Sequence, residues 1–202
     1  MAEKKKDRQR VITPLARVSF PNVFKARAFE KDKEPKFSCT LLFPKNTDLT
    51  PLKKAVTAAI VEKYGPDKEK WPKLRRPFND GDEKADLEGY AGMIYVTASN
   101  KFKPEVVDQK MRPISEESGK FYAGCYALFS LRAFCYGGKG TPYKPGVSFS
   151  LDAVQKHSDG EPFSGRLGAS EVFSEIDSGE DDESNYDDDS DDSSDDDEDT
   201  DW

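Results

Sequence analysis

Three segments of this sequence, 71–78, 101–112 and 136–144, combine lysine or arginine with aromatic residues. The cations of such a segment can follow the phosphates of a nucleic acid, and its rings can stack on bases, each stacked base contributing roughly 1–3 kcal/mol. A duplex hides its base faces, so this combination favours a single strand. The candidate DNA-binding residues, in these segments and in the apolar run between them, are Trp71, Arg75, Arg76, Lys101, Phe102, Lys103, Arg112, Tyr122, Arg132, Tyr136, Lys139, Tyr143 and Lys144.

The distribution of charge strengthens this interpretation. Residues 175–202 hold 17 Asp or Glu and no Lys or Arg, whereas residues 1–174 hold 31 basic and 22 acidic residues, a net charge of +9. A basic body suits a polyanionic partner. Taken alone, each candidate could instead belong to a solvated surface or to the hydrophobic core, but the set as a whole favours nucleic-acid binding.

The acidic segment 175–202 has few apolar residues and many charges that repel one another, so we expect a disordered tail. A flexible polyanion attached to a cationic groove competes with DNA at a high effective concentration. Trp202 is an unusual residue for a solvating tail and suggests docking in a pocket, which makes Asp199, Asp201 and Trp202 the candidate partner-binding residues. The alternative is a tail that only keeps the protein in solution.

Residues that support catalysis or metal binding are scarce. The single histidine, His157, excludes a His-rich metal site and lies in a polar segment. Cys39, Cys125 and Cys135 form no Cys-x-x-Cys pair and indicate reduced thiols in a cytosolic protein. We therefore expect no catalytic residue, no metal and no cofactor.

One carboxylate cluster, Asp80, Asp82 and Glu83, leaves a metal-dependent nuclease open as an alternative. Such an enzyme would use the carboxylates to hold Mg²⁺. The run Asn79-Asp80-Gly81 is also a turn signature in its own right. We favour the turn.

The elements that must position these residues are mostly strands. Period-two alternation and apolar runs predict strands at 11–20, 36–43, 90–99, 120–136 and 147–155. Residues 51–64 predict the one helix, which Thr50 can cap, with an apolar stripe and with Gly65 after its end. Residues 66–89 form a polar loop of a length that is often functional. Gly124 suggests a bend or bulge inside the longest strand.

These elements predict a mainly β fold: an OB-fold-like small barrel with one inserted helix and long loops, followed by a disordered acidic tail. We expect a flexible basic arm at 1–10, an OB-fold domain at 11–174 and the tail at 175–202. No apolar run is long enough for a signal peptide or a membrane span, so we expect no membrane contact.

Several runs of this sequence resemble a family of bacteriophage single-stranded DNA-binding proteins in order and spacing. These runs are RVSFPNVFKA, KFSCTLLFPK, RPFNDGDEK, VTASNKFKPEVVD, FYAGCYALFSLRAFCY and GVSFSLDAVQKHSDGEPFSGR. The resemblance covers about residues 14–170. It implies an OB fold with an acidic C-terminal tail that ends in an aromatic residue, more usually Phe than the Trp present here.

We therefore expect a non-sequence-specific single-stranded DNA-binding protein without catalytic activity. It would act in phage DNA replication, recombination or repair, in the cytoplasm of the infected bacterial host. Its partners would be single-stranded DNA and, through the tail, phage or host replication and recombination proteins; a homo-oligomer remains open. The main alternative is an acidic-tailed chaperone of basic proteins, whose tail would be the binding site, followed by the nuclease.

Overall fold

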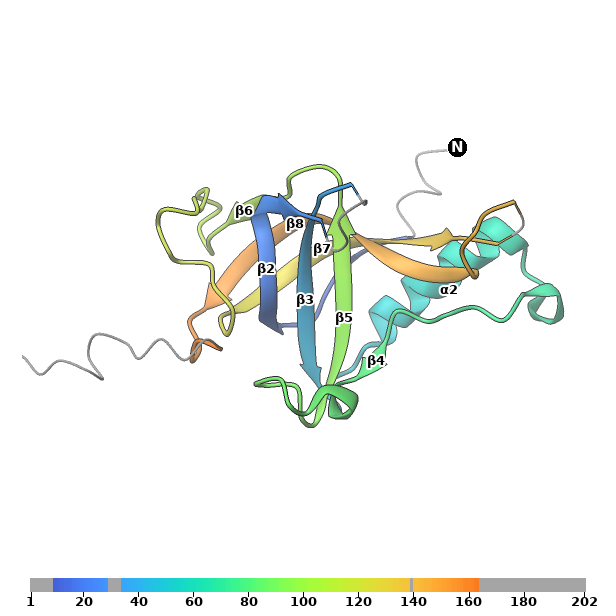
Figure 1. Cartoon of the computed structure of the whole chain (residues 1–202), viewed down its shortest axis with the longest axis horizontal. Helices are drawn as coiled ribbons and strands as arrows, with labels where there is room; N and C mark the ends of the chain where they lie inside the picture. The colour runs from blue at the N-terminus through green and yellow to red at the C-terminus, as the bar shows by residue number, and fades with distance from the viewer. Residues whose placement is uncertain (1–8, 29–33, 139, 164–202) are drawn as a thin grey trace, which may run out of the picture. The chain divides into compact units, whose positions relative to one another are not determined.

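The computed structural model describes residues 9–28, 34–138 and 140–163, which form a curved sheet and one long helix (Figure 1). The strands are β1 (Arg10–Ile12), β2 (Ala16–Arg27), β3 (Lys36–Pro44), β4 (Asn79–Asp80), β5 (Met93–Asn100), β6 (Glu105–Val107), β7 (Tyr126–Tyr136) and β8 (Gly146–Ser158). The helices are α2 (Thr50–Tyr64) and two short 3-10 helices, η1 (Lys68–Lys70) and η2 (Gly81–Lys84).

Five of these strands close into a ring. β7 pairs antiparallel with β2, β2 with β3, and β3 with β5. β5 then pairs in parallel with β8, which returns antiparallel to β7. β1 and β6 extend the sheet beside β7 and β8, and β4 pairs with β5. A closed five-stranded barrel confirms the predicted mainly β, OB-type fold.

The barrel interior is filled by side chains, because successive residues of a strand point to opposite faces. In β7, the alternate residues Ala127, Phe129 and Leu131 are fully buried, and β8 contributes Phe149 and Leu151. The apolar face of α2 packs against β7. A ligand must therefore lie on the outer surface of the barrel or among its loops.

The helix and the strands predicted at 36–43, 90–99 and 147–155 are confirmed with shifted ends, whereas the strand predicted at 11–20 is divided between β1 and β2. The helix begins at Thr50, which is its first residue instead of its cap, and the backbone N–H of Thr50 donates to the Asp48 carboxylate at 2.9 Å. Arg10, expected in the basic arm, belongs to β1. Residues 1–8, 164–174 and the predicted tail lie outside the described residues, so the division into arm, domain and tail remains a prediction.

The prediction of a single strand over 120–136 was wrong in its first part. β7 begins at Tyr126, and Gly124 lies in the loop before it with φ +111°, a conformation that favours glycine. The Gly124 N–H donates to the carbonyl of Val18 at 2.8 Å, and a Cβ placed on Gly124 would lie 2.0 Å from the Glu161 carbonyl oxygen. Gly124 therefore lets the segment after β8 pack against the loop before β7.

This close approach makes Gly124→Ala a test of the fold. We expect the substitution to reduce the free energy of unfolding by about 3 kcal/mol, because it combines backbone strain with overlap against the Glu161 carbonyl. The matched control is Gly65→Ala, where φ is +84° but nothing lies within 4 Å of the added Cβ; it should lose only the backbone-strain part, roughly 1–2 kcal/mol. Urea unfolding of both variants measures the difference, and equal losses would contradict the packing described here.

Candidate nucleic-acid interface

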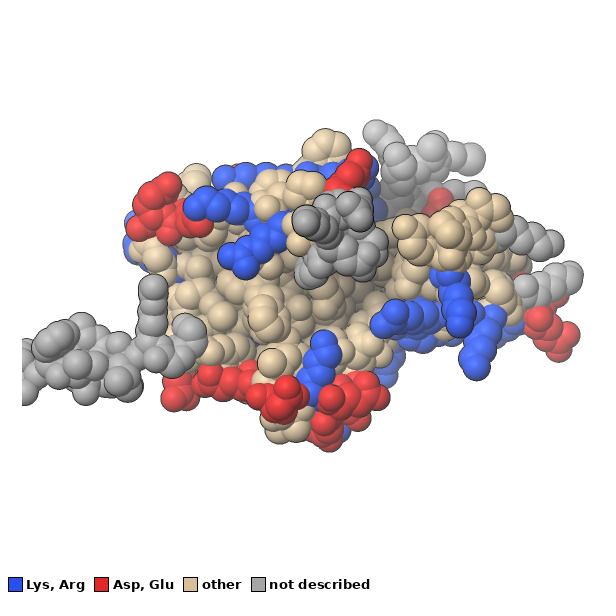
Figure 2. Space-filling view, viewed as in Figure 1, with Lys and Arg blue, Asp and Glu red and all other residues tan. Residues whose placement is uncertain are grey.

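A basic groove lies on the outer surface of the barrel, beside β5 and the start of β8. It has a volume of about 280 Å³. We call it the arginine groove; its lining residues are Arg75, Arg76, Pro77, Asn79, Lys84, Tyr95, Thr97, Tyr136, Val147 and Ser148. Figure 2 shows Lys and Arg side chains gathered over the segment between α2 and β4, next to a mostly uncharged surface over β2, β3 and β5. The groove brings together three residues predicted from sequence: Arg75, Arg76 and Tyr136.

Backbone pairing fixes the two arginines in place. The Arg75 N–H donates to the Pro145 carbonyl at 3.1 Å, and the Val147 N–H donates to the Arg75 carbonyl at 2.9 Å. Three residues later, the ring of Phe78 meets the core residue Phe149 edge-on, with centroids 6.3 Å apart. The long loop predicted at 66–89 is thus attached to β8, and its arginines have a defined position.

Aromatic rings form one wall of the arginine groove. The rings of Tyr90 and Tyr95 lie 5.4 Å apart, and the ammonium of Lys84 lies 5.1 Å from the centre of the Tyr95 ring. Tyr90 is buried, and its hydroxyl is 3.2 Å from the Ser19 hydroxyl, which holds this wall against β2. Sequence reasoning assigned Tyr95 to a strand and missed it as a site residue; its outward position in the alternation of β5 was the available signal.

A second pocket, of about 860 Å³, lies where the loop between β7 and β8 meets the end of α2. We call it the loop pocket; its lining residues are Lys63, Tyr64, Pro72, Gly137, Gly138, Thr141, Pro142, Tyr143, Lys144 and Pro145. It contains two predicted residues, Tyr143, whose side chain is exposed, and Lys144. The Gly138 N–H donates to the Tyr143 carbonyl at 3.1 Å and shapes the loop. The predicted Lys139 lies outside the described residues.

The predicted segment Lys101–Lys103 directly follows the last residue of β5. The residues of β5 that line the arginine groove, Tyr95 and Thr97, come earlier in the strand. Phe102 is 79% exposed, whereas Lys101 forms an ion pair with Glu34. Phe20, which sequence reasoning missed, is 56% exposed where the pairing of β2 with β3 shifts register. Its φ of +46° is rare for a non-glycine residue, and the Phe-Pro pair inside a strand was the only signal of an irregularity.

Four other predicted residues are held by internal contacts. Arg112 pairs with Asp108 at 2.6 Å, and Arg132 pairs with Asp152 at 2.9 Å. The Tyr122 hydroxyl donates to the Gly160 carbonyl at 2.9 Å. Their contact with DNA remains a prediction, and each of them has a structural role.

Trp71 is the fourth of these residues. Its indole N–H donates to the Gly65 carbonyl at 2.9 Å, and its ring packs on the core. By contrast, neither Arg75 nor Arg76 has an ion-pair partner among the described residues. The arginine groove is therefore one place where predicted cations remain available to a ligand; Lys103 and Lys144 also have no ion-pair partner among the described residues.

The carboxylates of the nuclease alternative have other partners. Lys45 forms ion pairs with Asp80 at 2.9 Å and with Asp82 at 2.5 Å, and these bonds hold the pKa of both carboxyls below the usual range. Asp80 also accepts the Asp82 N–H at 3.1 Å and begins η2, as the predicted turn requires. Within residues 9–28, 34–138 and 140–163, no group of His, Cys, Asp and Glu is arranged to hold a metal.

Two further predictions concern the tail and the membrane. The candidate partner-binding residues Asp199, Asp201 and Trp202 lie outside the described residues. In the described part of the chain, the helices lack the length and apolar character that crossing a bilayer requires.

Comparison with known proteins places this geometry in a family. The family model described as the single-stranded DNA-binding protein of Enterobacter phage Enc34 matches residues 9–185. A relative from Acyrthosiphon pisum secondary endosymbiont phage 1, named putative protein p50, is 34% identical over 177 residues, covering 83% of this chain and 94% of that protein.

Solved structures give the same result for the fold. The single-stranded DNA-binding protein of bacteriophage Enc34, solved in complex with single-stranded DNA, matches with a TM-score of 0.64 and 26% identity over 77% of this chain and 90% of that chain. Gp2.5, a single-stranded DNA-binding protein of bacteriophage T7, matches with a TM-score of 0.54 and 13% identity over 82% of this chain and 95% of that chain.

The ion pair of Arg112 predicts a pH-dependent stability. Hydrogen bonds from Arg112 lower the pKa of Asp108 from 3.8 to about 2. A carboxyl whose pKa is lower in the folded protein than in the unfolded chain stabilises the fold at pH values above the unfolded-state pKa. This stability is lost as pH falls from about 4 through about 2. We expect Asp108→Asn to melt below wild type at neutral pH and the difference to vanish near pH 2 in thermal scans. The exposed Asp86→Asn serves as the control, and a gap that persists at low pH would contradict the assignment.

Proposed function

This chain belongs to the Enc34 family of phage single-stranded DNA-binding proteins, and on that basis we propose that it binds single-stranded DNA without requiring a particular base sequence. The observation that carries the proposal is the arginine groove. It offers two arginines that have no ion-pair partner within residues 9–28, 34–138 and 140–163, and a Tyr95 ring on the outer surface of an OB-type barrel. Phosphates and base faces are the two features that a single strand presents together.

The groove supports this mechanism through its arrangement. The guanidinium groups of Arg75 and Arg76 neutralise phosphates, while Tyr95 and Tyr136 stack on bases. The loop pocket continues the basic and aromatic surface, because Pro145 lines it and also accepts the Arg75 N–H. Duplex DNA keeps its bases stacked inside, so it can use only the phosphate contacts and binds more weakly.

The cellular role follows from this binding. The protein coats exposed strands during phage DNA replication, recombination or repair in the cytoplasm of the infected bacterium, and it removes secondary structure without catalysing a reaction. The acidic segment 175–202 competes with DNA for the basic body and recruits partner proteins through Asp199, Asp201 and Trp202. In this proposal residues 11–174 are the DNA-binding domain.

The direct test measures binding of the full-length protein to a labelled single strand and to the matching duplex at several salt concentrations. We expect tighter binding to the single strand. The logarithm of the affinity should fall with the logarithm of salt by about 0.7 for each phosphate neutralised. Equal affinity for the duplex, or an affinity that does not respond to salt, would overturn the proposal.

Substitutions in the arginine groove should separate its two kinds of contact. Arg75→Ala or Arg76→Ala should lower both the affinity and the salt slope, because fewer counterions are released. Tyr95→Ala or Tyr136→Ala should weaken binding by roughly 1–3 kcal/mol and leave the slope unchanged, because stacking is not ionic. Lys53→Ala, which removes a charge from the exposed face of α2, is the control. If all the variants change only the melting temperature, the groove is not the binding site.

Removal of residues 175–202 should tighten DNA binding most at low salt. The segment carries 17 acidic residues, and its competition with DNA is electrostatic, so added salt should bring the full-length and truncated proteins together. If the chain is instead an acidic-tailed chaperone, truncation abolishes partner binding and leaves DNA affinity unchanged.

Trp202→Ala should leave DNA affinity unchanged and reduce capture of replication or recombination proteins from infected-cell extract.

A further inference from the structure

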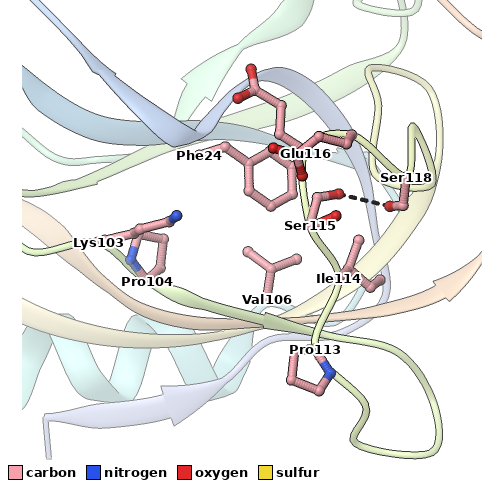
Figure 3. A pocket seen from close by; sticks show the side chains of 10 residues that line it. Phe24, Lys103, Pro104, Val106, Pro113, Ile114, Ser115, Glu116 and Ser118 are labelled. Atoms are coloured by element: carbon pink, nitrogen blue, oxygen red, sulfur yellow. Dashed lines mark hydrogen bonds between the residues drawn. The ribbon is translucent and has the colours of Figure 1, made fainter.

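A third pocket, of about 360 Å³, lies at the end of β2 opposite the arginine groove, and no contact described above uses it. Figure 3 shows its walls, which come from β2, from the segment that joins β5 to β6, and from the loop after residue 112. The lining residues are Phe24, Lys103, Pro104, Val106, Pro113, Ile114, Ser115, Glu116, Glu117 and Ser118. We call it the Phe24 pocket.

The floor of the Phe24 pocket is apolar and well supported. The ring of Phe24 meets Phe121 edge-on, with centroids 6.3 Å apart, which leaves a face of Phe24 toward the cavity (Figure 3). Val106 and Ile114 lie beside it, and the Ile114 N–H donates to the Val106 carbonyl at 2.8 Å. A flat aromatic ring over an apolar floor suits a flat ligand. The volume of the Phe24 pocket lies within the range of about 300–1,000 Å³ that small-molecule pockets occupy.

The rim of the pocket is charged, and its charges are matched. Glu116 pairs with Lys25 at 2.9 Å. The Glu117 carboxylate accepts hydrogen bonds from the Glu117 backbone N–H and from the Ser115 hydroxyl. These bonds, together with the charges of Lys25 and Lys103, hold the pKa of Glu117 below its usual range. The Glu117 carboxylate is therefore ionised and accepts hydrogen bonds only. Lys25 is already paired with Glu116 and does not line the pocket, so Lys103 is the lining cation that can meet a phosphate at this opening.

This combination matches a nucleotide whose base carries an amino group. A carboxylate accepts from the N4 amino group of cytosine, which is a recurrent pairing in base recognition, whereas thymine presents a carbonyl oxygen at the same position. The neighbouring residues supply a route, since Lys103 directly follows the exposed Phe102 at the end of β5. A strand that leaves the outer face of the barrel past Phe102 reaches the Phe24 pocket next.

We infer that the Phe24 pocket is a nucleobase subsite of the single-strand interface and that it favours cytosine over thymine. The inference rests on the proposed single-strand binding and adds a base preference to it. In this subsite the base stacks on Phe24, Lys103 holds the phosphate, and Glu117, or Glu116 beside it, accepts the amino group. The preference is modest, because the other contacts of the interface do not depend on the base.

The test compares two strands of equal length and equal charge, oligo(dC) and oligo(dT), at one salt concentration and neutral pH. Phosphate contacts are then the same, and the ratio of affinities reports the base. We expect the full-length protein to bind oligo(dC) about fivefold more tightly, the effect of about one net hydrogen bond. The double variant Glu116→Gln, Glu117→Gln should bring the ratio close to one, because an amide both donates and accepts.

Glu105→Gln is the control for loss of a carboxylate charge, half of the charge that the double variant removes, because Glu105 is an exposed residue of β6 that does not line the pocket. It should raise both affinities slightly and keep the ratio. A wild-type ratio near one, or a ratio that survives in the double variant, would overturn the subsite while single-strand binding stands. If wild type binds neither strand, the proposed function itself fails. Thermal scans of each variant show whether the fold is retained.

Discussion

The closure of the barrel is the constraint on which the other features depend. β8 pairs with β7 along most of its length and with β5 in parallel, so one strand joins the two ends of the sheet. Closure commits one face of every barrel strand to the interior, where Phe129, Phe149 and Leu151 are fully buried. All recognition must then use outward-facing residues and loops. This explains why the candidate contacts come from short segments spread along the chain instead of from one motif.

The second step is the attachment of a long loop to that closed barrel. A loop of this length would ordinarily be a poor platform for recognition, because each arginine would lose conformational freedom on binding. The pairing of Arg75 with the start of β8 and the contact of Phe78 with Phe149 order the loop before any ligand arrives. Arg75 and Arg76 therefore line the same groove as Tyr95. Binding energy is then available for phosphates and bases.

The sequence predicted the barrel, the helix and three of the ten residues that line the arginine groove, because these follow from local patterns. Alternation marks β3 and β8, and a proline after a polar turn marks α2. It could not predict which cations remain available, since that depends on partners distant in sequence. Arg132 and Arg75 are the same residue type and both were predicted to bind DNA, yet β8 places Asp152 beside Arg132. Phe20 and Tyr95 were missed because their sequence signals, a Phe-Pro pair and an outward position in the alternation of β5, do not show which side chains from other strands lie beside them.

Charge pairing thus sorts the basic residues of the body into two kinds. Arg112, Arg132 and Lys45 have carboxylates of the same domain as partners, so their loss would affect stability first. Arg75 and Arg76 have none among the described residues. A chain with a body of +9 needs such sorting, because cations distributed evenly would bind any polyanion in any orientation. In the proposed function, Arg75 and Arg76 lie in one groove next to rings on which the bases of a single strand can stack, and this arrangement turns a general attraction for nucleic acid into a preference for single strands.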